Sequence, residues 1–204
     1  LSSEILKKHS ITYFLETILK NYNKDKFEIY LYLDNAIEDE NTNEFKILVK
    51  KFINVSNLED IKVFNLIRTD NIDIMFDITG ATLSNRVSLF KNRLAPKQIS
   101  WLGYCNTSGL ANMDYLIADK NLIYEEEKNY YSEKIIYLPN IWNCHSGLNS
   151  IRSLSDPPCL KEKNITFGSF NNFNKINDKV VGVWSQILLK VKNSKLILKS
   201  SSKM

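Results

Sequence analysis

The chain has 204 residues, of which 44% are hydrophobic, and a formal net charge of +4. This apolar content is ordinary for a globular protein that buries a core, and no stretch approaches the roughly 20 apolar residues that a membrane helix needs. Basic residues are scattered and offset by acidic clusters at residues 38–40 and 125–127, whereas a nucleic-acid groove gathers basic residues on one face. Composition therefore argues against membrane and nucleic-acid partners.

The cysteines and histidines are too few and too scattered to indicate a metal site. Cys105, Cys144 and Cys159 have no paired spacing, and the chain has two histidines, which disfavours zinc. A sparse, odd number of cysteines fits a reducing cytoplasm, so we expect a cytoplasmic protein. The first ten residues lack the apolar core of a signal peptide. Because the chain does not begin with Met, we also expect that it continues upstream.

Helical and strand patterns alternate through the first 80 residues. Apolar residues recur with helical spacing at residues 10–22, 44–51 and 58–68. Between these helices, patterns rich in β-branched and aromatic residues predict strands at residues 27–33 and 52–55. Residues 72–78 form a nearly continuous apolar run, which is typical of a strand buried on both faces of a parallel sheet.

Three further short strands are expected at residues 98–102, 115–118 and 134–138. Strands separated by helices predict an α/β fold whose parallel sheet has right-handed crossovers. Ligands of such sheets bind beyond the carboxyl ends of the strands. The loops that follow Ile78 and Trp101 are therefore the first places to search for a site.

A second domain is predicted to begin after a linker. Residues 146–163 contain Gly147, two consecutive prolines and several serines, a composition typical of a linker. A strand, a helix and a strand then follow at residues 164–170, 178–191 and 195–199. A single βαβ unit cannot bury both faces of a sheet. We therefore expect a first lobe at residues 1–145, a linker at 146–163 and the truncated start of a second lobe at 164–204.

The two loops beyond the strands contain glycine and small polar residues. In residues 77–82, Gly80 permits a tight turn or the close approach of a ligand. An ordinary turn in which Thr82 or Ser84 caps the next helix explains the same residues. The loop at residues 103–109 suits backbone contact with a sugar, but a surface loop that only redirects the chain is an equal alternative.

Several motifs follow one another along nearly the whole chain. They are APxQxxWLGY, TSG and MDYxIAD within residues 95–119, YSEK at 131–134 followed by Leu138-Pro139, FGSFNNFNK at 167–175, and His9 followed by the Tyr-Phe-Leu of residues 13–15. In this order they resemble the protein O-linked N-acetylglucosamine transferases, including the SPINDLY-type members. The resemblance implies a GT-B glycosyltransferase with two Rossmann-like lobes, a site in the cleft between them and tetratricopeptide repeats upstream.

The resemblance also implies the reaction. The family moves N-acetylglucosamine from UDP-N-acetylglucosamine to serine or threonine hydroxyls of protein acceptors, with inversion at the sugar. The expected partners are thus a nucleotide-sugar donor and a protein or peptide acceptor. The chain has no D-x-D triplet, with which many metal-dependent sugar transferases hold a divalent ion. We therefore expect no metal and no other cofactor.

Two residues of the FGSFNNFNK motif correspond to positions near the donor diphosphate. The resemblance assigns Lys175 to the charge that grows on the leaving UDP, which a positioned cation stabilises. Composition alone would make Lys175 one of many solvated lysines. Asn172 stands where many relatives have a Gln near the diphosphate, and its reach is shorter. Asn174 replaces an aromatic residue that is frequent in relatives.

The remaining family positions lie in the first lobe. His9 corresponds to a histidine of the catalytic cleft, where it could accept a proton or hold the sugar and peptide in place; we favour positioning. Glu4 is a weaker match to an Asp just upstream. Arg86 matches an arginine that lines the acceptor side, although a surface charge explains it too.

The loop facing the donor sugar aligns with Leu102, Gly103 and Tyr104. Cys105 and Asn106 depart from the Pro-Gly that usually follows, which leaves the donor open: GDP-fucose on the same scaffold is the first alternative. A non-catalytic peptide-binding fragment is the second. A generic nucleotide-binding protein is disfavoured because the chain has neither a GxGxxG nor a GxxxxGK[ST] run.

Overall fold

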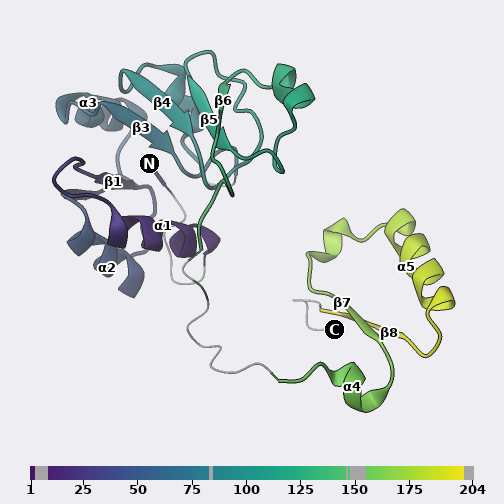
Figure 1. Ribbon diagram of the computed structural model, residues 1–204. Helices are drawn as coiled ribbons and strands as arrows, with labels where there is room; N and C mark the ends of the chain where they lie inside the picture. The colour runs from purple at the N-terminus through teal and green to yellow at the C-terminus, as the bar shows by residue number, and fades with distance from the viewer. Residues whose placement is uncertain (3–8, 83–84, 146, 148–154, 200–204) are drawn as a thin grey trace. The chain divides into compact units, whose positions relative to one another are not determined.

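The computed structural model describes residues 1–2, 9–82, 85–145, 147 and 155–199. The chain forms two compact units, Leu1–Gly147 and Leu148–Met204 (Figure 1). In the part of the chain that is described, no helix is long and apolar enough to cross a membrane.

The first unit alternates helices and strands. In chain order its elements are α1 (Ser10–Asn21), β1 (Tyr30–Leu33), α2 (Glu40–Leu48), β2 (Lys51–Asn54), α3 (Asp60–Thr69), β3 (Ile74–Asp77), η1 (Val87–Lys91), β4 (Lys97–Ser100), β5 (Tyr115–Ala118), η2 (Glu125–Tyr130) and β6 (Lys134–Tyr137). The named strands pair in parallel, which confirms the predicted α/β fold. The 3₁₀ helices η1 and η2 were not predicted from the sequence.

The start of α2 differs from the prediction, which began this helix at residue 44. The Asp39 carboxylate accepts hydrogen bonds from the backbone N–H groups of Asn41 and Thr42, at 3.0 and 3.2 Å. The Thr42 hydroxyl in turn accepts from the Asp39 N–H at 2.7 Å. This reciprocal capping satisfies N–H groups that a helix start leaves unpaired, so the helix begins at polar residues that apolar periodicity does not mark.

Residues Leu1 and Ser2 join two groups of strands into one sheet. β1 pairs with β2, and β3 to β6 lie in that order. The Ser2 N–H donates to Tyr32 O at 3.0 Å and Asp34 N–H donates to Ser2 O at 2.7 Å, while Ile78 N–H donates to Leu1 O at 3.2 Å. The spatial order is therefore β2, β1, residues 1–2, β3, β4, β5, β6.

Both faces of this sheet are covered, as the apolar run of β3 predicted. Leu31 and Leu33 of β1 pack with α1 and α2, in one buried cluster. Tyr32, between them, points to the other face and belongs to a second cluster with α3 and η1. Alternating side chains of a strand point to opposite faces, so helices on both sides bury the sheet and the sequence is apolar at consecutive positions (Figure 1).

The second unit is a βαβ arrangement. Its elements are α4 (Pro158–Glu162), β7 (Thr166–Ser169), η3 (Phe173–Lys175), α5 (Asp178–Lys190) and β8 (Lys195–Leu198). β7 pairs in parallel with β8. The expected linker contains α4, which starts with Pro158 because proline has no N–H to lose and a fixed φ at a helix start. None of the described residues 155–199 is fully buried.

Candidate functional site

The strand order of the first unit defines where a ligand site belongs. From residues 1–2 the chain passes through α1 to β1 on one side, and β3 lies on the other side. The order of strands reverses between residues 1–2 and β3, and α/β sheets bind ligands at such a reversal, beyond the carboxyl ends. His9, the turn after β3 and the loop after β4 all follow strands near this point. The candidate site of this unit is therefore the carboxyl edge next to β3.

His9 is the N-terminal cap of α1. Its backbone is extended (φ −103°, ψ 141°), and its Nδ1 accepts a hydrogen bond from the Ile11 N–H at 3.3 Å. Nδ1 can accept only while it carries no proton. A proton moved to this nitrogen would thus break the cap of α1. This hydrogen bond holds the imidazole in position at the start of α1.

Asp77 closes the turn at the end of β3. One of its oxygens accepts from the N–H groups of Thr79 and Gly80, both at 3.0 Å, and the residue is only 3% exposed. Gly80 takes a left-handed φ of 66°. Asp77 organises this turn, and the Thr82 hydroxyl donates to Thr79 O at 3.4 Å. Ser84, the other capping residue expected from the sequence, lies outside the described residues, as does Glu4.

The loop after β4 begins with a strained turn. Leu102 has a φ of 81°, and the Gly103 N–H donates back to Trp101 O at 3.1 Å. This is the rarer, strained form of γ-turn. Leu102 is 1% exposed and packs in the α1–α2 cluster. A left-handed bulky residue costs roughly 1–3 kcal/mol and persists only where its surroundings impose it.

The second half of the same loop is held inside the first unit. The Ser108 N–H and hydroxyl both donate to one oxygen of Glu133, the former at 2.8 Å. The Thr107 hydroxyl donates to the other oxygen at 2.7 Å. Glu133 directly precedes β6 and is 4% exposed, so Thr107 and Ser108 lie toward the amino end of that strand. Of the loop at residues 103–109, only its start lies at the candidate site.

Sequence reasoning did not identify Asp77 and Glu133 as the residues that organise these two loops. Asp77 is the last residue of one strand and Glu133 directly precedes another, and acidic residues at strand ends are common on protein surfaces. One sequence feature could have indicated the pairing of Glu133 with Thr107 and Ser108. Glu133 belongs to the YSEK motif and its partners belong to the TSG motif, and the two motifs occur in the same order as in the family. Burial and pairing of these carboxylates became visible only in the structure.

Arg86 lies against three other segments of the first unit. Its Nε contacts Asp34 Oδ1 at 2.9 Å and its Nη1 contacts Asp60 Oδ1 at 2.9 Å. Nη2 donates to Val55 O at 3.2 Å. The side chain is 13% exposed. An arginine engaged in this way acts as a cross-link, and contact with an acceptor would require it to exchange partners.

Lys175 and Asn172 lie in the second unit, just before α5. Lys175 ends η3 and is exposed, and no described residue pairs with its ammonium group. Asn172 caps η3: its side-chain oxygen accepts from the Asn174 N–H at 3.0 Å. Asn177 then caps α5 by accepting from the Val180 N–H at 3.1 Å. A cation two residues before the N-cap of a helix is well placed for an anionic group.

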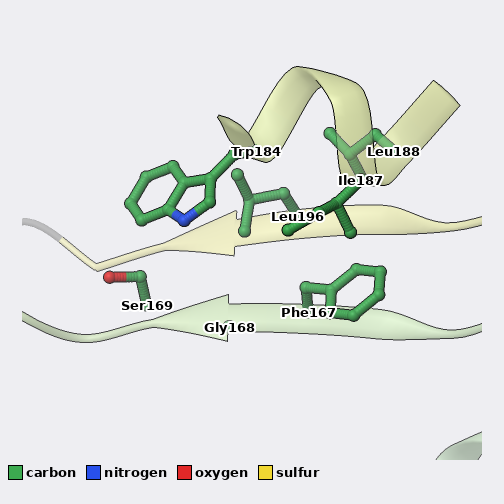
Figure 2. A pocket seen from close by; sticks show the side chains of 7 residues that line it. All are labelled: Phe167, Gly168, Ser169, Trp184, Ile187, Leu188 and Leu196. Atoms are coloured by element: carbon green, nitrogen blue, oxygen red, sulfur yellow. The ribbon is translucent and has the colours of Figure 1, made fainter. Parts of the chain in front are cut away.

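A hollow of about 280 Å³ lies between α5 and the two strands of the second unit (Figure 2). Apart from Ser169, its walls are apolar or glycine; they are formed by Phe167, Gly168, Ser169, Trp184, Ile187, Leu188 and Leu196. Figure 2 shows the side chains of α5 directed toward the strands across this space. The hollow offers few hydrogen-bonding groups for a nucleotide, so it is loose packing of a helix on a sheet.

No metal centre is evident in the described ranges. Within them, no three His, Cys, Asp or Glu side chains gather closely enough to hold an ion. His9 and Lys175 belong to different units, and each is positioned by the elements of its own unit.

Parallel strands covered by helices on both faces, followed by a separate βαβ unit, form the pattern of Rossmann-like α/β lobes, of which a GT-B glycosyltransferase has two. The solved structure of a Lys-to-Met mutant of Thermobaculum terrenum O-GlcNAc transferase matches with a TM-score of 0.89 and 28% identity, over 97% of this chain and 37% of that chain. Residues 1–156 match the model of Glycosyl transferase family 41. The chain belongs to this family, as the motif resemblance predicted.

Curated relatives agree with this assignment. A tomato (Solanum lycopersicum) protein described as a probable UDP-N-acetylglucosamine–peptide N-acetylglucosaminyltransferase SPINDLY is 35% identical over 94% of this chain and 21% of its own length. The SPINDLY protein of Arabidopsis thaliana is 34% identical over the same shares, and the SEC protein of that plant is 26% identical over 93% of this chain and 20% of its own length. The chain thus spans about a fifth of the length of these relatives.

Proposed function

We propose that the protein containing this chain transfers N-acetylglucosamine from UDP-N-acetylglucosamine to serine or threonine hydroxyls of proteins, with inversion. The observation that carries the proposal is the structural likeness to an O-GlcNAc transferase over 97% of the chain. The names of the SPINDLY relatives point to the same donor and acceptor class. The first unit then serves as most of the first catalytic lobe, and residues 164–204 begin the second.

The reaction is a direct displacement at the anomeric carbon. The acceptor hydroxyl oxygen forms a bond to that carbon, the bond to the diphosphate oxygen breaks, and UDP leaves with the electron pair while the hydroxyl loses its proton. Charge therefore develops on the diphosphate. Lys175 supplies the opposing charge, supported by its exposed place before the N-terminus of α5. With Lys175 in this role, the transfer needs no metal or other cofactor.

The other residues position the substrates. Asn172 lies on the same short turn as Lys175 and serves the diphosphate. The backbone of Leu102, Gly103 and Tyr104 faces the donor sugar, and His9 holds the sugar and peptide near the start of α1. Arg86 serves the acceptor side indirectly. Its guanidinium is already paired with Asp34 and Asp60, so it holds together the segments on that side and does not contact the acceptor itself. The sparse cysteines support a cytoplasmic location.

The test is turnover by the full-length protein with labelled donors and a serine-containing peptide. We expect incorporation from UDP-N-acetylglucosamine, a β-linked product from the α-linked donor, and undiminished activity in EDTA. Incorporation from GDP-fucose alone would identify the fucosyl alternative, and peptide binding without turnover of either donor would identify the non-catalytic one. The 204-residue chain by itself should show no turnover, because it contains only the beginning of the second lobe.

A further inference from the structure

Two neighbouring loops at the carboxyl edge of the sheet interlock through glycines. A Cβ atom added to Gly80 would lie far inside van der Waals distance of Tyr104 Cβ and 2.9 Å from Tyr104 Cγ. A Cβ atom added to Gly103 would lie 3.0 Å from Thr79 Cα. Each loop thus occupies the space that a side chain on the other would need. The turn after β3 and the start of the loop after β4 form one packed unit.

This contact involves atoms that cannot move independently of the backbone. Tyr104 meets Gly80 with its Cβ, which is fixed to the main chain, so rotation of the tyrosine ring relieves nothing. Behind it, Leu102 is held in its left-handed γ-turn, and its buried side chain anchors the turn in the core. On the other side, Asp77 holds Gly80 through the hydrogen bond to its N–H. A shift at Gly80 must therefore displace the backbone of residues 102–104.

We infer that Gly80 is a positioning residue for the donor loop at Leu102, Gly103 and Tyr104. This inference rests on the proposed function, because it assigns that loop to the donor sugar. Gly80 itself touches no reacting atom in this scheme. It sets where the loop lies by admitting Tyr104 against the turn that ends β3. Displacement of a substrate-positioning group by about 1 Å can cost up to about 100-fold in rate.

The chain provides a matched control at Gly109. Its φ of 69° is close to the 66° of Gly80, so alanine strains the backbone similarly at both positions. A Cβ atom at Gly109, however, meets nothing within 4 Å, and Thr107 and Ser108 before it are held by Glu133, away from the candidate site. Gly80→Ala and Gly109→Ala therefore share the strain and differ in the contact with Tyr104.

The experiment compares both variants in the full-length protein. We measure amide hydrogen exchange across residues 101–104, thermal unfolding, and kcat and KM for UDP-N-acetylglucosamine. Gly80→Ala should speed exchange in this segment and lower kcat/KM by about 10- to 100-fold. Gly109→Ala should lower Tm only by the backbone strain, and therefore by less than Gly80→Ala, and it should leave both exchange and kcat/KM near wild type. Unchanged exchange in Gly80→Ala, faster exchange with wild-type kcat/KM, or equal kinetic losses in both variants overturns the inference.

The experiment also covers a Gly80→Ala variant that does not fold and a wild-type protein that shows no turnover. If Gly80→Ala does not fold, Gly80→Ala combined with Tyr104→Gly removes the clashing Cβ and should fold again; failure to do so overturns the inference. If the wild-type protein turns over neither donor, the proposed function is wrong. The exchange comparison then decides by itself whether Gly80 holds the loop.

Discussion

The guanidinium of Arg86 contacts the carboxylate of Asp34 at 2.9 Å, and each side chain is only 13% exposed. Asp34 follows the end of β1, whereas Arg86 directly precedes η1. The same guanidinium reaches Asp60, at the start of α3. One side chain therefore joins the carboxyl end of β1 to the start of α3, the helix that leads to β3.

Replacing Arg86 with Met should destabilise the first unit by about 3 kcal/mol, because removing one partner leaves a largely buried carboxylate without its counter-charge. Arg68→Met, an exposed arginine in the last turn of α3, should change stability by no more than about 0.5 kcal/mol. Urea unfolding of the 204-residue chain measures both. Unfolding midpoints that agree for the two variants would contradict the cross-link, and a higher peptide KM without loss of stability would instead support direct acceptor contact.

Lys175→Met in the full-length protein should lower kcat by about 10²- to 10³-fold, the range for losing one preorganised electrostatic contact. Methionine keeps much of the length and removes the charge. Lys190→Met, in the last turn of the same helix α5, is the control and should keep wild-type turnover. Near-normal kcat in Lys175→Met would show that the lysine does not stabilise the leaving diphosphate.

A donor whose leaving group needs little charge stabilisation separates Lys175 from His9. Such a donor should partly restore turnover to Lys175→Met, because the missing charge matters less. It should not restore His9→Ala, which loses the cap of α1 and the positioning of substrate. Rescue of both variants to the same degree would mean that the two roles have been wrongly assigned.

Asp119, which directly follows β5, anchors the segment after β6 by hydrogen bonding. Its carboxylate accepts from the Trp142 N–H at 2.7 Å and from the N–H groups of Asn121 and Leu122. Trp101 Nε1 donates to Trp142 O at 2.7 Å. Burial alone would raise the pKa of Asp119, but the three backbone donors outweigh it and the pKa is lowered. The folded state therefore prefers the ionised carboxylate.

A lowered pKa fixes the direction of the pH effect. Asp119 contributes stability above its unfolded pKa of about 3.9, and this contribution disappears as pH falls through the lower folded pKa. Asp119→Asn should reduce the free energy of unfolding at pH 7. The variant should also lose less stability than the wild type as the pH falls from about 5 to the folded pKa, and its tryptophan fluorescence should change. Asp25→Asn, at an exposed site, should retain the wild-type pH profile. The same profile in both variants contradicts the assignment.

The second unit should unfold before the first. None of its described residues is fully buried, and large apolar side chains remain exposed, including Leu189 at 83% and Phe170 at 73%. Little apolar burial means little free energy to offset chain entropy. Trp184, the tryptophan of this unit, should respond to urea at a lower concentration than Trp101 and Trp142 do. A single coincident transition in variants that keep one tryptophan at a time would contradict this.

The predicted helices and strands match those of the structure to within a few residues, except where capping or proline chemistry sets the boundary. α2 starts early because Asp39 and Thr42 cap each other. Residues 158–162 form a helix inside the expected linker because Pro158 favours a helix start. Apolar periodicity shows which face of a helix or strand is buried. It does not mark helix ends that consist of polar residues, so those boundaries are predicted poorly.

The sequence by itself determined the alternation of helices and strands, the parallel sheet and the family, because these depend on local periodicity and on motifs in order. Only the tertiary structure decided which polar residues meet. Arg86 reaches Asp34, Glu133 holds Thr107 and Ser108, and Gly80 admits Tyr104. These partners are 24 or more residues apart, and they are brought together by the crossovers between strands, which no local pattern encodes.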